Sequence, residues 1–173
     1  KHLSGEPLEP VYVEELIGKT WTKKDRTPIS GLDLVEYAYA WTVTADDFVV
    51  RESRFIDLQT GKHFSEKQIV PAFLAKRVDP KKSHSGFLLK GAAGSQYPSF
   101  EPVRVDLECE GQREAVRVEH LAALIERAQP TVTAALSAFQ ERRKDIFAPD
   151  ALPVVVRVSS ILAEGPRLQA VDD

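Results

Sequence analysis

The sequence has few of the residues from which metal and redox sites are usually recognised. It contains one cysteine, Cys109, and four histidines, at positions 2, 63, 84 and 120. A lone cysteine forms no internal disulfide, which suits a reducing compartment, and we expect a cytoplasmic protein. The histidines are too dispersed to give the ligand spacing of a zinc site. We therefore expect no bound metal and no cofactor.

The motifs that identify common enzyme classes are also missing. There is no Gly-rich phosphate loop, no H-E-x-x-H motif and no nucleophile elbow. Ser83 lies beside His84, but neighbours in sequence rarely form a working nucleophile and base, so we interpret 83–86 as a polar loop. The sequence leaves open whether the chain is an enzyme, and its catalytic residues, if any, are unknown.

Long hydrophobic runs and repeats are absent as well. The aliphatic run Val154-Val155-Val156 is far too short to span a bilayer, and residues 1–10 are polar, unlike a signal peptide. We see no internal repeat and no low-complexity tract. We expect no membrane partner, a flexible N-terminal arm over 1–10 and a single domain over 11–173.

Charge is unevenly distributed along the chain. The net charge is −3, which argues against a general polyanion binder. Residues 19–90, however, carry 13 Lys and Arg against 9 Asp and Glu, and ten of the eleven lysines precede residue 91. The first half could therefore present a basic face, although a chance imbalance explains the same numbers.

Alternating residues predict a long antiparallel hairpin near the start of the chain. Strands are expected over 34–44 and 48–58, joined by the turn Ala45-Asp46-Asp47. The period of two places Tyr37, Tyr39 and Trp41 on one face. We interpret these aromatics as core residues beneath a helix; the alternative is a platform that stacks a base, a sugar or a peptide aromatic.

A long amphipathic helix is expected in the second half. Residues 119–147 carry an apolar stripe with a period of 3.6 residues, and the stripe continues on the same helix face after Pro130. Pro130 removes a backbone donor, so the helix must kink or break there. The predicted fold class is α+β: a mainly antiparallel sheet whose apolar face is covered by this helix, interrupted at Pro130.

Shorter elements complete the predicted fold. Ser65 and Gln68 have the spacing of a capping box and predict a helix over 66–78 that Pro71 interrupts. A turn-rich segment is expected over 91–99. The remaining predicted strands cover 86–90, 103–109, 115–118 and 154–159.

The candidate binding surface combines cations with aromatic and imidazole groups. Lysines beside a tryptophan suit phosphate contact together with base stacking, whereas the simpler interpretation is a solvated loop anchored by that tryptophan. The residues of this candidate surface are Trp21, Lys23, Lys24, Lys81, Lys82 and His84.

One acidic strand is the candidate cation site. Asp106, Glu108 and Glu110 alternate, so they project from one face and could bind a divalent cation through oxygen. We favour the simpler interpretation, a solvated sheet face compensated by Arg113 or Arg117. Cys109 falls on the apolar phase of this strand, where a buried thiol would be inert.

The sequence therefore predicts an interaction protein. We expect a small soluble protein of inhibitor, immunity or adaptor type, acting on a protein partner by surface complementarity. The alternative is a nucleic-acid-associated protein that uses the basic 19–90 region, including a metal-dependent nuclease on the acidic strand. A metal-independent hydrolase ranks third.

Overall fold

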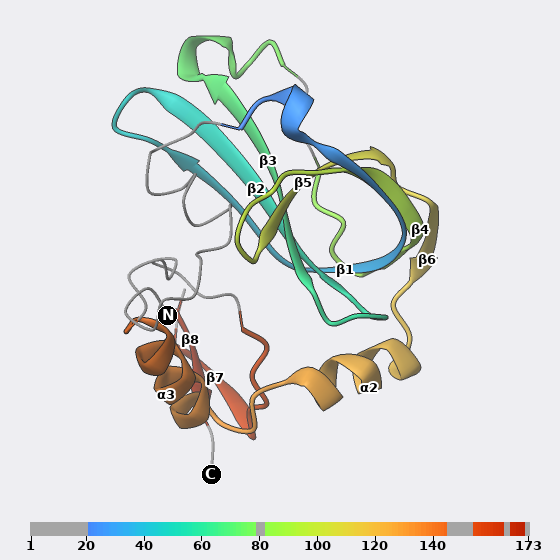
Figure 1. Ribbon diagram of the computed structural model, residues 1–173. Coiled ribbons are helices and arrows are strands. Elements are labelled where there is room, and N and C mark those ends of the chain that lie inside the picture. Colours follow the sequence, from blue (N-terminus) through green and yellow to red (C-terminus); the bar gives the residue numbers. More distant parts are fainter. Residues whose placement is uncertain (1–20, 79–81, 145–153, 165–166, 172–173) are drawn as a thin grey trace, which may run out of the picture. The chain divides into compact units, whose positions relative to one another are not determined.

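The computed structural model describes residues 21–78, 82–144, 154–164 and 167–171. The chain divides into two compact units, Lys1–Val116 and Arg117–Asp173, and each is described here by itself (Figure 1). The expected arm, 1–10, lies outside the described residues. The expectation of a single domain over 11–173 stays a prediction.

The first unit is a six-stranded mixed sheet in the order β1-β2-β3-β5-β4-β6. β3 and β5 are parallel, and all other pairs are antiparallel. The elements are η2 (Lys23–Asp25), β1 (Thr27–Val43), β2 (Phe48–Asp57), β3 (His63–Pro71), η3 (Ala72–Leu74), β4 (Phe87–Gln96), β5 (Val103–Cys109) and β6 (Gln112–Ala115).

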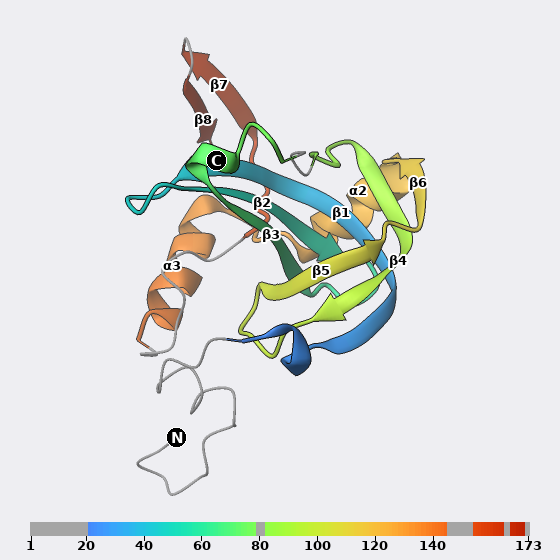
Figure 2. The ribbon, with the colours of Figure 1, turned by 90° about the horizontal axis from the view of Figure 1, so that it is seen from above.

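The long strand β1 closes this sheet into a barrel. Its first part pairs with β4 as far as Val35, and its second part pairs with β2 from Leu34 to Val43. Figure 2 shows β1 running beside β2 and curving toward β4. Gly31 has a positive φ of 73° and lies where the β1–β4 register shifts. A glycine adopts this conformation without steric cost, and such an irregularity lets the strand bend. Closure makes a five-stranded Greek-key barrel from β1 to β5, with β6 extending β4.

The core of the first unit lies inside the barrel. Leu34, Phe55, Phe64, Leu89 and Val105 each expose 1% or less and come from five different strands. Phe55 pairs with Phe64, and every second residue of these strands points inward from that pair. The hydrophobic effect is therefore satisfied within the barrel, without another layer.

The second unit contains two short helices and a hairpin. α2 (Val118–Arg127) ends where Ala128 becomes extended, and α3 (Val132–Arg142) begins after the cap residue Thr131. The chain between them forms a parallel bridge, Gln129 to Val156. The hairpin joins β7 (Ser160–Glu164) to β8 (Arg167–Val171). No helix among the described residues is long and apolar enough to cross a membrane.

The predicted sheet covered by a long helix is wrong. The break does fall around Pro130, because α2 and α3 end and begin on either side of it, but both helices are short and belong to the second unit. Leu121 and Ile125 from the predicted stripe stay about half exposed. The physical reason is barrel closure, which turns the apolar sheet face inward.

Several shorter elements also differ from prediction. In place of the helix predicted over 66–78, the chain forms the end of strand β3 and the short η3, and the Ser65 hydroxyl bonds Glu52 on the neighbouring strand instead of capping a helix. The turn-rich 91–99 segment lies mostly in β4, where small residues permit close strand approach rather than turns. A Cβ on Gly94 would lie 2.2 Å from the carbonyl oxygen of Asp106. β6 pairs with β4 rather than folding back on β5.

Candidate binding surface

The most exposed apolar side chains of the first unit gather at one end of the β1–β2–β3 sheet, which we call the sheet tip. The register places Val43 opposite Val49 and Phe48 opposite Pro71, and the Ala72 amide donates to the carbonyl of Asp47. The members of the sheet tip, with their exposed fractions, are Trp41 (65%), Val43 (57%), Phe48 (39%), Ile69 (52%) and Phe73 (80%).

The predicted core position of the hairpin aromatics is wrong. Trp41 shares the inward phase of Phe55, but β1 by then pairs only with β2 among the described strands, and Trp41 is 65% exposed. A register shift between Glu36 and Ala38 also separates the aromatics. This bulge turns Tyr37 away from the face that carries Tyr39 and Trp41.

Polar side chains mark where the core ends and the sheet tip begins. Arg51, opposite Trp41, donates to Gln68 at 2.9 Å. Two residues before Gln68 on β3, Glu66 is 4% exposed and accepts a hydrogen bond from the backbone amide of Leu107. The pairing of β3 with β5 spans only Phe64 and Ser65 on β3. The Glu66 carboxylate therefore provides the acceptor for a β5 backbone amide that lies beyond this pairing. The sheet tip therefore projects from a closed, hydrogen-bonded barrel end.

A charge network stiffens the outer face of β2 and β3. Glu52 accepts from the Ser65 hydroxyl at 2.7 Å and lies 3.3 Å from Arg54 and 3.7 Å from Lys67. Burial by itself raises the pKa of Glu52, but the Ser65 hydrogen bond and the two cations outweigh it and lower the pKa below its ordinary value. Arg54 and Lys67 are therefore already paired with Glu52.

Tyr37 forms a second polar group on this outer face. Its hydroxyl lies 3.2 Å from Nδ1 of His63, and the two rings meet edge to face. The His63 amide donates to the Glu101 carboxylate. Burial, chiefly, raises the pKa of Tyr37 to about 12, and the charges of Glu52 and Glu101 add to it. Tyr37 is therefore a neutral, structural hydroxyl at physiological pH.

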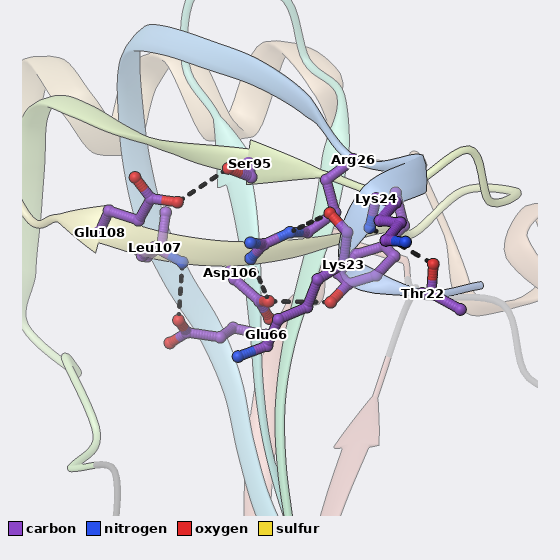
Figure 3. Close-up of polar contacts among 10 residues, drawn as sticks. Thr22, Lys23, Lys24, Arg26, Glu66, Ser95, Asp106, Leu107 and Glu108 are labelled. Atoms are coloured by element: carbon purple, nitrogen blue, oxygen red, sulfur yellow. Dashed lines mark hydrogen bonds and ion pairs between the residues drawn. The ribbon is translucent and has the colours of Figure 1, made fainter.

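The candidate lysines Lys23 and Lys24 lie within η2, the short helical turn before β1. Thr22 and Asp25 cap η2 reciprocally, and Lys23 and Lys24 are exposed. Arg26 is not a free cation, because it bonds Asp106 at 2.9 Å (Figure 3). Trp21, which precedes this turn, is half-buried.

The structure does not bring the two groups of predicted site residues together. Thr27, which follows η2, pairs with the last residue of β4, whereas Lys82 and His84 precede the first residue of β4. Lys82 is exposed, His84 is buried, and Lys81 lies outside the described residues. The predicted surface is thus split between opposite ends of a ten-residue strand.

His84 belongs to a buried polar cluster rather than to an open surface. Glu36 accepts hydrogen bonds from the Ser83 hydroxyl and the His84 amide. His84 packs against Phe55, and its Nδ1 lies 3.8 Å from the Glu110 carboxylate. Ser83 bonds Glu36 and not His84, so the cluster is no nucleophile and base pair. It ties the loop before β4 to β1.

The acidic strand does not gather its carboxylates. Asp106 accepts from Arg26 and from the Tyr97 hydroxyl, and Glu108 accepts from Ser95 (Figure 3). Glu110 lies past the end of β5. No group of three or more possible metal-ligating side chains occurs among the described residues.

The arginines predicted to compensate the acidic strand do not do so. Arg113 lies over the Phe87 ring and Arg117 lies beside Glu119, so neither compensates Asp106. Cys109 is exposed rather than buried, because it is the last residue of β5.

The sheet tip was only partly visible in the sequence. Of its members, only Trp41 was predicted as a possible binding residue, whereas Val43, Phe48, Ile69 and Phe73 were not. The available signal was the run of nine uncharged residues from Tyr37 to Ala45, ending at two aspartates.

No protein-family model, curated protein or solved structure matches this chain.

Proposed function

We propose that this protein is a small interaction protein that binds another protein at the sheet tip. The observation that carries the proposal is the exposure of large apolar side chains at one end of the β1–β2–β3 sheet, led by Phe73 at 80% and Trp41 at 65%. Trp41 and Val43 lie on one face of this sheet and Phe48 and Ile69 on the other, so the tip presents apolar side chains on both faces. A concentration of exposed apolar side chains marks an interaction site more often than scattered single residues do.

The composition of the sheet tip favours a protein over a nucleic acid. Val43 and Ile69 are β-branched and offer no flat face for a base, whereas they pack well against side chains. Trp41, Phe48 and Phe73 are the residue types that anchor protein interfaces. The turn at the end of the hairpin carries Asp46 and Asp47, which would repel phosphates.

A single-stranded nucleic acid is the second candidate, favoured by one observation. Five-stranded Greek-key barrels of the OB-fold type bind oligonucleotides on the face of strands 2 and 3 and on nearby loops, and this barrel has the same strand order. The likeness is one of topology only. Arg54 and Lys67 on that face lie beside Glu52. Exposed cations remain at Lys76 and Arg77, just after η3, and at Lys23 and Lys24.

The proposal is compatible with an inhibitor, immunity-type or adaptor role in the cytoplasm. An exposed thiol such as Cys109 is more stable in a reducing compartment, because it oxidises or pairs with other thiols elsewhere. The proposal needs neither a cofactor nor a metal.

The test compares variants of the sheet tip with a matched control. The full chain with Ile69→Ser and Phe73→Ser should lose at least ~10-fold in affinity for a purified partner identified by capture from source cells, since apolar anchors dominate interface energy. Phe87→Ser, at the exposed phenylalanine that begins β4 and is not a member of the sheet tip, should retain affinity. Equal binding by all three proteins would refute the proposal.

A second measurement tests the alternative function, binding of a single-stranded nucleic acid. Binding of single-stranded DNA or RNA in a gel-shift titration at about 150 mM salt should be negligible. Micromolar binding that disappears when Lys23, Lys24, Lys81 and Lys82 are all changed to Glu would favour the nucleic-acid function instead.

A further inference from the structure

We propose that the sheet tip binds an extended segment of another protein in which an apolar residue lies between a basic residue and an acidic residue. The inference deepens the proposed function and rests on it, because it names the chemistry of the partner that the sheet tip accepts. It is carried by the charges of opposite sign that adjoin the exposed apolar side chains on the β2–β3 side of the sheet tip.

Two exposed turns meet at the sheet tip. The first is the hairpin turn between β1 and β2, which carries Asp46 and Asp47. The second, which we call the η3 turn, comprises residues 72–78 directly after β3. The Ala72 amide donates to the carbonyl of Asp47 at 2.7 Å, so the two turns are neighbours in space.

The η3 turn presents an aromatic side chain beside a cation. The amides of Ala75 and Arg77 each donate to the carbonyl three residues earlier, which is the hydrogen-bond pattern of a 3-10 helix. Side chains three residues apart lie on the same side of such a helix, so Phe73 and Lys76 are neighbours. Phe73 is 80% exposed, and Lys76 is exposed as well.

The charges on the two turns have no ion pair within the described part of the chain. The two aspartates of the hairpin turn are exposed, as are Lys76 and Arg77, and none of them pairs with another described residue. They differ in this from Arg54 and Lys67, which already pair with Glu52. The aspartates can therefore accept a basic group from a partner, and the two cations can accept an acidic one.

Apolar side chains adjoin both charged turns. Phe48 directly follows the hairpin turn and is opposite Pro71, the residue that precedes the η3 turn. Ile69 lies on the same sheet face as Phe48 and is 52% exposed. The β2–β3 side of the sheet tip therefore combines an acidic turn, exposed apolar side chains and a basic turn.

The spacing of these groups suits an extended chain. With a rise of about 2 Å per residue, Lys76 lies roughly 8 Å along the η3 turn from Ala72, where this turn contacts Asp47. An extended segment covers that span with about two or three residues. A segment with a basic residue on one side of an apolar residue and an acidic residue on the other therefore complements the sheet tip. A segment whose two flanking residues have the same charge meets a like charge at one of the turns, which disfavours its binding.

A polyanion is less complementary to this surface. Phosphates would suit Lys76 and Arg77, but a nucleic acid carries the same charge at every position and would meet Asp46 and Asp47 as well. The mixed charge therefore favours a protein segment.

Peptide selection on the full chain tests the inference directly. Random dodecapeptides displayed on phage are depleted on the Phe73→Ser protein and then selected on the parent protein, so that the retained peptides need the sheet tip. We expect these peptides to carry an apolar residue between a basic and an acidic one. Selection on the double variant Lys76→Glu, Arg77→Glu should yield basic residues in place of the acidic one.

The affinity of one selected synthetic peptide provides a matched comparison. Lys76→Glu with Arg77→Glu should weaken binding at least ~10-fold, because acidic groups then face each other. Lys23→Glu with Lys24→Glu changes another adjacent pair of exposed cations and should leave the affinity unchanged. Binding to the parent protein should weaken at about 500 mM salt, which screens exposed charges. Circular dichroism checks the fold of each variant, since exposed charges contribute little to stability.

The remaining outcomes contradict the inference in distinguishable ways. Uncharged peptides that still require Phe73 would overturn it and leave the proposed function standing, as would a dimer in sedimentation equilibrium that Phe73→Ser dissociates. Single-stranded DNA that binds at about 150 mM salt and is lost from the Lys76→Glu, Arg77→Glu protein would overturn it in favour of a nucleic acid. Selection of no peptide that requires Phe73 would also overturn it, and the capture experiment with Ile69→Ser and Phe73→Ser then decides the proposed function separately.

Discussion

Trp41 illustrates how the position of one residue separates a core aromatic from a surface one. It has the inward phase of Phe55, yet it is 65% exposed and Phe55 is fully buried. We expect Trp41→Ala to cost less than about 1 kcal/mol in the free energy of unfolding, and Phe55→Ala about 3–5 kcal/mol. Urea titration measures both. A loss of several kcal/mol for Trp41→Ala would mean that a core covers the sheet tip.

Tyr37 should be recognisable by its late ionisation. Its pKa is about 12 in the folded chain, chiefly because of burial, whereas an unfolded tyrosine ionises near 10. The folded state therefore holds this proton longer, and stability falls as pH rises from about 10 to 12. The ultraviolet titration should contain a step near 12 that Tyr37→Phe removes; an unchanged titration in that variant would contradict the assignment.

Glu52 should stabilise the fold only while it is ionised. Its folded pKa lies below the ordinary value, so its contribution is present above the unfolded pKa and is lost as pH falls through the folded pKa. We expect Glu52→Gln to cost about 1 kcal/mol at pH 7. The difference from the parent protein should close in acid, as followed by denaturation at several pH values. A gap that persists in acid would argue against the charge network.

Among the elements, β4 depends most on small residues, because it lies between β5 and β1. A Cβ on Gly94 would lie 2.2 Å from a backbone oxygen of β5, whereas one on Gly86 would meet nothing within 4 Å. Gly94→Ala should therefore cost more than about 3 kcal/mol, and Gly86→Ala about 1 kcal/mol for its positive φ alone. Thermal melting of both variants distinguishes them; similar losses would mean that the strands do not approach this closely.

Elements defined by local pattern were predictable, and those defined by distant contacts were not. The hairpin of β1 and β2 is confirmed, since alternation and the aspartate turn are local signals. β3 was mistaken for a helix because the Ser65–Gln68 spacing is shared by a cap and by a strand whose hydroxyl bonds a neighbour. Only the contact between Gly94 and β5 shows that the small residues of β4 serve pairing rather than turns.

At the scale of the molecule, closure explains both the wrong fold class and the partly missed surface. An apolar sheet face in a sequence implies a cover, and only the pairing of β1 with both β2 and β4 shows that the sheet covers itself. The same long strand carries Trp41 and Val43 past the barrel and exposes them. No local pattern in the sequence indicates where a strand leaves its barrel.

The central claim is that the sheet tip is a protein-docking surface. The most direct measurement places a photo-cross-linking amino acid at Phe73 in the full chain, in its source cells, with the same group at Phe87 as control. We predict a discrete protein adduct at position 73 that is absent at position 87. No adduct at 73, equal adducts at both positions, or a nucleic-acid adduct at 73 would contradict the account.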